Sequence, residues 1–274
     1  MITKTEASLW TDGRYFIQAA AQLEGTTVEL MKMGEPGVPE MNAYIEEVLK
    51  EGETLGFDGR VVSVGEGEGY AAIAGKKNAK VNYQVDLIDE IWEDRPVLSE
   101  EPAFNLDVKY AGETVASKLA RIREEMKEAG TNVHVVSTLD DICWTLNIRG
   151  NDIDFFPLVL SYGIITMDSF ELYIDERKLD DKLKAKLAKD GVNLHPYNDI
   201  YEDVKKFGSD VVAMIDPGKL NYALFNNIPE NVKTVKKRNP AILMKAIKNP
   251  VEIENIRKAQ IKDSVAPVSY THLT

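Results

Sequence analysis

The chain has 274 residues, of which 44% are hydrophobic and 28% charged, and 45 acidic residues against 33 lysines and arginines give a net charge of −12. This length and composition are typical of a globular protein of about two domains with a substantial core, and they exclude an intrinsically disordered chain. The acidic balance repels phosphate groups and argues against nucleic-acid binding, and no apolar run approaches the roughly 18 residues that a membrane helix needs.

The N-terminal part begins with a short strand and a helix joined at a corner. We expect the strand over residues 7–10, a turn at Asp12-Gly13, and a helix over Tyr15–Leu23, whose apolar residues recur at helical spacing. Arg14 then lies at the strand-to-helix corner, where its side chain can be held rigidly and still reach outward. One interpretation is a solvated arginine at a turn, and the other is a ligand-binding residue.

Further elements complete a first domain, which we expect to span residues 1–96. The pattern predicts one helix and three strands, in the order strand 27–31, helix 41–49, strand 60–64 and strand 80–83, with residues 85–92 closing the region. Gly65–Tyr70 resembles a dinucleotide-binding fingerprint, but Tyr70 replaces the third glycine and two glutamates would repel a pyrophosphate. We therefore interpret this stretch as a turn, and residues 97–108 as an interdomain linker.

The second domain, expected over residues 109–240, alternates strands with helices. The predicted elements are helix 114–129, strand 133–136, a helix from Thr138, a strand hairpin over 162–167 and 171–174, helix 180–190, strand 192–195, helix 200–207 and strand 211–215. At Thr138 an aspartate follows three residues later, which approximates a capping box. Alternation of this kind predicts an α/β sheet covered by helices, and the hairpin makes the sheet mixed.

The C-terminal part is expected to hold one strand and one helix. Residues 241–247 form an apolar run that we interpret as a strand. Asn249 as N-cap and Pro250 at the first helical position then predict a helix start, with the helix reaching about residue 265. Pro267 is expected to stop it.

The chain carries no recognisable catalytic set. The three histidines, His134, His195 and His272, are far apart, and none lies in a zinc-binding helix motif. The single cysteine, Cys143, excludes an intrachain disulfide and a cysteine metal cluster, and its apolar surroundings predict a buried, inert thiol. We therefore expect no catalytic and no metal-ligating residue.

One polar cluster, Asn147–Asp152, follows an apolar helix and contains Arg149. One interpretation is an ion pair between Arg149 and an aspartate that braces a turn. The alternative is a rim on which Arg149 touches substrate or another domain.

Nearly the whole chain resembles the aminopeptidase P branch of the creatinase/prolidase family, in its three-domain form. The stretches that carry the resemblance are Trp10–Phe16, Leu30–Gly34, Asp89–Pro96, Leu139–Asp152 and Lys245–Ala266. In this family the arginine of the first motif is associated with substrate binding, which implies the same for Arg14. Several such motifs in order are far more specific than any one of them.

The resemblance implies two noncatalytic α/β domains, each with a mixed sheet flanked by helices, followed by a pita-bread catalytic domain. That third domain holds two divalent metal ions, commonly manganese, on two Asp, one His and two Glu. Residues 241–265 would be its beginning, so we expect no metal ligand and no bound cofactor in this chain. The resemblance starts part-way through the first domain, which we expect to be incomplete, and residues 266–274 depart from the family and are suspected to be non-native.

The expected function is therefore the N-terminal part of a metal-dependent Xaa-Pro aminopeptidase, which releases the first residue of peptides with proline second. This part would shape access to the active site, bind the substrate end, and be inactive without its own catalytic domain. We expect a cytoplasmic enzyme, with a homodimer possible at full length and no nucleic-acid or membrane partner. The alternatives are a stand-alone peptide-binding or assembly module without hydrolase activity, and a relative acting on other amides.

Overall fold

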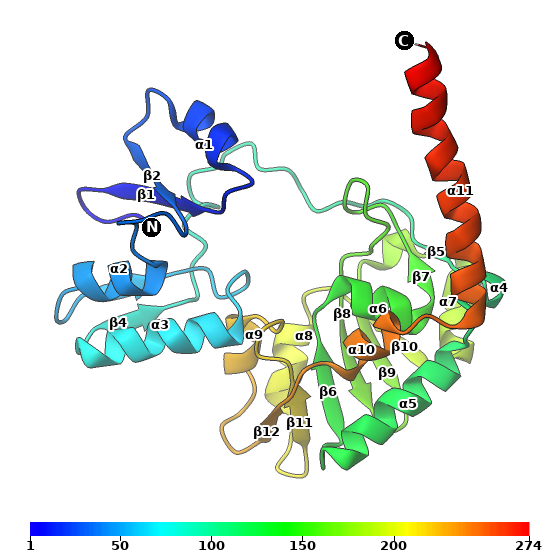
Figure 1. The fold of residues 1–274 in the computed structure, drawn as a ribbon. Coiled ribbons are helices and arrows are strands. Elements are labelled where there is room, and N and C mark those ends of the chain that lie inside the picture. Colours follow the sequence, from blue (N-terminus) through cyan, green and yellow to red (C-terminus); the bar gives the residue numbers. More distant parts are fainter. Residues whose placement is uncertain (274) are drawn as a thin grey trace. The chain divides into compact units, whose positions relative to one another are not determined.

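The computed structural model describes residues 1–273, which form two compact units (Figure 1). The first unit comprises residues 1–57 and 66–85, and the second comprises residues 58–65 together with the chain from residue 86 onward. None of the helices within the described residues has the length and the apolar character needed to cross a membrane.

The first unit contains two pairs of parallel strands. β1 (Ala7–Thr11) pairs with β2 (Val28–Lys32), and α1 (Phe16–Leu23) connects them, as the motif predicts. β3 (Thr54–Gly56) follows α2 (Met41–Val48) and pairs with β4 (Lys80–Asn82). The buried residues of this unit's core lie on α2, β3 and the helix before β4: Ile45, Leu49, Leu55, Ile73 and Ala74.

The expected strand over 60–64 and the expected turn at Gly65–Tyr70 are both wrong, because α3 (Val64–Lys76) begins there. The backbone N–H of Val64 donates to the Leu220 carbonyl at 2.9 Å, and that of Gly65 donates to the Pro217 carbonyl at 2.8 Å. These long-range bonds satisfy donors of the first helical turn. A Cβ at Gly65 would lie 3.4 Å from the Pro217 oxygen, so this glycine allows a close backbone approach and does not mark a turn.

The second unit is built on a six-stranded mixed sheet, which confirms the predicted α/β class. Its strand order is β10-β9-β8-β6-β11-β12. The strands are β6 (Val133–Val136), β8 (Ser161–Thr166), β9 (Phe170–Ile174), β10 (Val192–His195), β11 (Val212–Ile215) and β12 (Lys233–Lys236). Only β8 runs against its neighbours, because it forms the predicted hairpin with β9. The other five strands share one direction, so their carboxyl ends lie at one edge of the sheet.

Helices cover both faces of this sheet. One core cluster contains residues of α5 (Val115–Glu128), α6 (Leu139–Leu146), α7 (Asp181–Lys189) and α10 (Pro240–Ala246), and α5 crosses the sheet in Figure 1. The other contains residues of α8 (Ile200–Asp203), the 3-10 helix η2 (Val204–Lys206) and α9 (Tyr222–Asn226). The strands alternate between the clusters: in β11, Met214 faces the first, and Ala213 and Ile215 face the second.

Smaller elements lie around this sheet. β5 (Phe104–Asn105) pairs antiparallel with β7 (Ile148–Arg149), so the end of the expected linker 97–108 is held against the second unit. α4 (Val108–Ala111) and the 3-10 helix η1 (Glu176–Lys178) complete the unit. At α6, Thr138 makes no side-chain cap bond to the backbone, so the expected capping box there is wrong; its hydroxyl donates to Asp141 at 2.6 Å.

The C-terminal part differs from two expectations. Residues 241–247 do not form a strand, because Asn239 accepts from the Ala241 N–H and caps α10, with Pro240 at its first position. α11 (Pro250–Leu273) starts as predicted, since Asn249 and Glu252 each accept from the other's backbone N–H at 3.0 and 2.9 Å. The helix nevertheless continues past Pro267, whose missing N–H removes one helical hydrogen bond without ending the helix.

Candidate functional site

Arg14 is an exposed cation held by the residue two positions before it. Its Nε and Nη2 donate to the Asp12 carboxylate at 2.9 and 2.7 Å, and its backbone N–H donates to the same carboxylate at 3.0 Å. These bonds lower the pKa of Asp12 to about 2. The Arg14 side chain is 79% exposed at the strand-to-helix corner that the sequence predicts. The aspartate fixes one edge of the guanidinium, and its Nη1 has no bond to another group within residues 1–273.

Arg149, the second candidate, points back into its own unit. It lies on β7, and its Nη1 donates to the carbonyls of Cys143 and Ile148 at 2.9 and 2.8 Å. Burial lowers the pKa of its guanidinium. The Cys143 carbonyl also accepts from the backbone N–H of Asn147, the C-cap of α6, so Arg149 adds a second donor at the end of that helix. The expected ion pair between Arg149 and an aspartate is therefore wrong.

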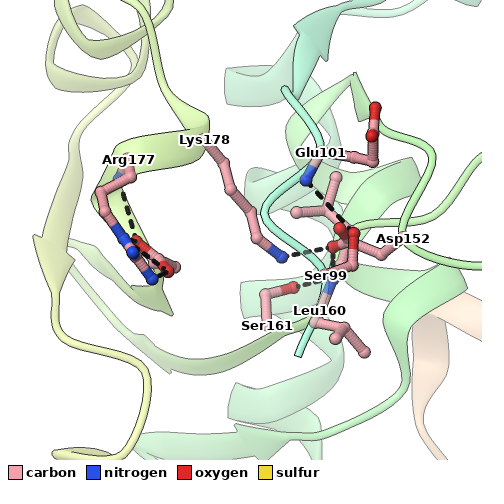
Figure 2. Close-up of polar contacts among 9 residues, drawn as sticks. Ser99, Glu101, Asp152, Leu160, Ser161, Arg177 and Lys178 are labelled. Atoms are coloured by element: carbon pink, nitrogen blue, oxygen red, sulfur yellow. Dashed lines mark hydrogen bonds and ion pairs between the residues drawn. The ribbon is translucent and has the colours of Figure 1, made fainter. Parts of the chain in front are cut away.

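The aspartate of this cluster pairs with a lysine that the sequence did not single out. Asp152 Oδ2 accepts from Lys178 Nζ at 2.6 Å and from the Leu160 backbone N–H at 2.6 Å. The side chains of Asp152 and Lys178 are 0% and 2% exposed. Figure 2 shows the lysine extending from η1 to the carboxylate. Within residues 1–273, the other carboxylate oxygen of Asp152 has no hydrogen-bond partner.

This ion pair anchors a loop with an apolar tip. Asp152 and Leu160 lie on the two sides of the loop, so one carboxylate joins both to η1. At the tip, Ile153, Phe155 and Phe156 expose 41%, 104% and 57% of their surface. Phe155 has φ of +63°, a conformation that a bulky residue adopts only when its surroundings impose it. The chain thus holds three apolar side chains in solvent on an anchored loop.

A buried lysine fixes the start of the polar cluster. Lys118 is 1% exposed, and its Nζ donates to the Trp144 carbonyl at 2.8 Å and to Asn147 Oδ1 at 2.7 Å. Burial lowers the pKa of Lys118 to about 8. Asn147 ends α6 in a left-handed conformation with φ of 52°. The signal that could have identified Lys118 is its place on the apolar face of α5, between Val115 and Ile122.

His134, His195 and Cys143 make structural contacts, and the side chain of His272 lies outside the described part of the chain. His134 is buried, with its two ring nitrogens 3.0 Å from the Met214 carbonyl and 3.2 Å from Asn239 Oδ1, and burial lowers its pKa. His195 lies 2.7 Å from the Glu171 carboxylate. Cys143 is buried, as predicted, and burial raises the pKa of its thiol to about 11. Within residues 1–273, no group of three or more His, Cys, Asp or Glu side chains is placed to hold a metal ion.

Comparison with known proteins assigns both halves of the chain to one kind of domain. Residues 1–91 match one sequence family described as a creatinase/prolidase N-terminal domain, and residues 94–252 match a second family of the same description. The two matches meet near the residues where the sequence places the end of the first domain.

Relatives match almost the whole chain. An aminopeptidase P of Arabidopsis thaliana is 33% identical over 98% of the chain and 45% of its own length. A Xaa-Pro aminopeptidase of Caenorhabditis elegans is 34% identical, again over 98% of the chain and 45% of its own length. The chain therefore spans about half the length of the relatives it matches.

A solved structure shows the same fold throughout. The crystal structure of X-prolyl aminopeptidase from Caenorhabditis elegans, described as a cytosolic enzyme with a di-nuclear active site, superposes with a TM-score of 0.93 at 33% identity. The match covers 98% of this chain and 45% of that one.

Proposed function

The chain belongs to the creatinase/prolidase family, and from this premise we propose that it is the noncatalytic part of a metal-dependent Xaa-Pro aminopeptidase. Such an enzyme releases the N-terminal residue from peptides with proline in the second position. The observation that carries the proposal is the TM-score of 0.93 over 98% of the chain with an X-prolyl aminopeptidase. A shared fold along nearly the whole chain supports a shared role for both domains.

The proposal assigns the peptide cleavage to a catalytic part of the enzyme outside residues 1–274. Two divalent metal ions, commonly manganese, would supply the hydrolytic chemistry there. Residues 1–273 do not fit such a metal pair, because no cluster of three or more suitable side chains lies among them. We therefore expect this chain alone to bind no manganese and to cleave no Xaa-Pro peptide, and measured turnover of Arg-Pro-Pro by the purified chain would contradict that expectation.

Arg14 is the residue we assign to substrate. A guanidinium donates hydrogen bonds to carbonyl and carboxylate oxygens and repels an ammonium group. The exposed, aspartate-held guanidinium is therefore suited to a peptide carbonyl or a C-terminal carboxylate, and not to the free amino end. Because Asp12 already fixes its orientation, little side-chain entropy is lost on binding.

The test of this role is Arg14→Ala in the full-length enzyme. Loss of one exposed charge-assisted hydrogen bond of about 1 kcal/mol should raise KM roughly fivefold with kcat and metal content unchanged. Arg177→Ala is the matched control, because Arg177 is also exposed and bonded to an aspartate two residues earlier, Asp175. If the wild type and Arg14→Ala have equal KM values, Arg14 is a solvated residue at the corner and does not bind substrate.

The second candidate function is a stand-alone peptide-binding or assembly module without hydrolase activity. The anchored apolar loop at Ile153–Phe156 favours it, because exposed apolar groups on a held loop suit contact with another surface. Calorimetry of the purified chain with Xaa-Pro peptides separates the two functions. A part that only shapes access to a catalytic centre shows no affinity by itself, whereas a peptide-binding module gives a saturable heat.

We further propose a cytoplasmic location, which the cytosolic description of the Caenorhabditis elegans relative supports. A homodimer is proposed only for the full-length protein. Sedimentation of that protein, compared with sedimentation of this chain, tests the proposal.

A further inference from the structure

In the sheet of the second unit, the connections that follow the neighbouring parallel strands β6 and β11 run to opposite faces of the sheet. β6 and β11 pair in parallel. The chain leaving β6 enters α6, whose Ile142 packs in the first core cluster, and the chain leaving β11 leads to α9, whose Leu224 packs in the second. In open α/β sheets, a crevice outside the carboxyl ends of strands at such a point is where ligands bind.

A cleft of about 490 Å³ lies at this point. Its walls are the segments that follow β6, β11 and β12, together with α10. This volume falls within the usual range of small-molecule sites, roughly 300–1,000 Å³. The cleft is thus at the position, and of the size, expected of a binding site, and no residue discussed above as a substrate contact lines it.

The carboxylates of the cleft are already satisfied by the protein. Asp141 accepts from Thr138 Oγ1 at 2.6 Å, Asn239 Nδ2 at 2.8 Å and Lys245 Nζ at 2.7 Å. The two oxygens of Asp216 accept from backbone N–H groups at 2.9 and 3.1 Å. Asn239 is 3% exposed and bonds to both acids, which makes the floor a fixed network. Asp140 also lines the cleft, and it accepts from the same Lys245 Nζ as Asp141 does.

The cations of the cleft are only partly satisfied. Lys237 pairs with Glu125 at 3.0 Å, and Lys245 pairs with Asp140 and Asp141. Lys236 also has a partner, and its Nζ lies 5.6 Å from the centre of the Phe225 ring. Within residues 1–273, neither Lys219 Nζ nor the Arg238 guanidinium makes a hydrogen bond or ion pair with another group. Five cationic side chains and three aspartates therefore line the cleft, and two of the cations, Lys219 and Arg238, have no bonded acceptor among the described residues.

We propose that this cleft binds a small organic oxyanion, whose carboxylate or phosphate group is held by Lys219 and Arg238. A guanidinium and an ammonium together suit either group, because both present several acceptor oxygens. The fixed floor would accommodate the uncharged remainder of the ligand. This site is separate from the peptide-binding role of Arg14, which lies in the first unit.

The test is an NMR titration of the isotope-labelled chain with inorganic phosphate and, separately, with N-acetylglycine. N-acetylglycinamide is the uncharged control. We expect saturable shifts in the backbone amides of Asp216, Gly218, Lys219 and residues 236–239 with at least one anion and none with N-acetylglycinamide. The anion that binds more tightly identifies the carboxylate or the phosphate as the group recognised.

Two double variants of equal charge change decide whether the cleft is the site. Lys219→Ser/Arg238→Ser should weaken binding at least about tenfold, because it removes both unpaired cations. Lys182→Ser/Lys189→Ser, on the exposed part of α7, should change it less than about twofold. Absence of saturable shifts with both anions up to roughly 20 mM, or equal binding by the two variants, overturns the proposal. Neither measurement needs peptidase activity, so its outcome is independent of the proposed function.

Discussion

Replacing Lys178 by methionine should destabilise the second unit far more than a charge loss usually does. The change keeps the length of the side chain but leaves the Asp152 carboxylate, 0% exposed, without its counter-ion. The Leu160 N–H would remain its one donor among residues 1–273. Removing one partner of a buried pair costs about 3–5 kcal/mol, because an uncompensated charge stays out of water. We expect a loss of that size in the free energy of unfolding.

The neighbouring residue supplies the control. Arg177 is 67% exposed and bonds to Asp175, so Arg177→Met should cost less than about 1 kcal/mol. Both residues lie on η1 and appear in Figure 2. A double variant, Lys178→Met/Asp152→Asn, removes both charges and retains an acceptor for the Leu160 N–H. It should recover most of the loss, to within about 2 kcal/mol of the wild type.

Urea unfolding followed by Trp144 fluorescence measures these differences. Trp144 is 5% exposed in the core of the second unit, and replacing Trp10 and Trp92 by phenylalanine isolates its signal. The slope of the transition should stay the same in all variants, since the surface exposed on unfolding does not change. If Lys178→Met is no more destabilising than Arg177→Met, the buried pair does not anchor the loop.

Two further predictions concern titration. Arg14→Ala should let the pKa of Asp12 rise from about 2 toward 3.8, which carboxyl-carbon NMR measures. The stability that the Arg14–Asp12 pair contributes is present above pH 3.8 and is lost as the pH falls through about 2. An unchanged pKa of Asp12 in the variant would contradict the pair. The ammonium of Lys118 should titrate near pH 8, which nitrogen NMR measures. Because burial disfavours the charged form only in the folded state, the free energy of unfolding should rise with pH between about 8 and 10.5, and this rise should be absent in Lys118→Met. Titration of Lys118 near pH 10.5 would refute the effect of burial.

Local patterns determined much of this fold. Strand β6 and the β8–β9 hairpin follow from periodicity, and the start of α11 follows from Asn249-Pro250. The same Asn-Pro pair occurs at Asn239-Pro240, where it starts α10; the apolar run that follows was interpreted as a strand because a short apolar run fits both structures. Where a short apolar run fits both a helix and a strand, a capping residue before the run is the stronger signal for a helix, since its hydrogen bond forms within the first helical turn.

Motif resemblance determined the family, and comparison with relatives confirms it. It also pointed to Arg14, whereas Arg149 was a candidate because it lies in the polar cluster Asn147–Asp152, and the structure separates these two candidates. Arg14 is exposed with part of its guanidinium unbound, whereas Arg149 is half-buried and bonded to the end of α6. Their roles in substrate binding stay predictions until the full-length enzyme is assayed.

By itself, the sequence determined most elements of the second unit and the family, because caps, turns and periodicity act between residues a few positions apart; it failed at α3 and α10. Only the tertiary structure decided which charges meet. Asp152 pairs with Lys178, 26 residues away, and not with Arg149, because the sheet places η1 beside the loop. Asn239 reaches Asp141, 98 residues away, for the same reason. Partners of buried charges, and the cations left unpaired at the cleft, depend on which strand ends the topology brings together.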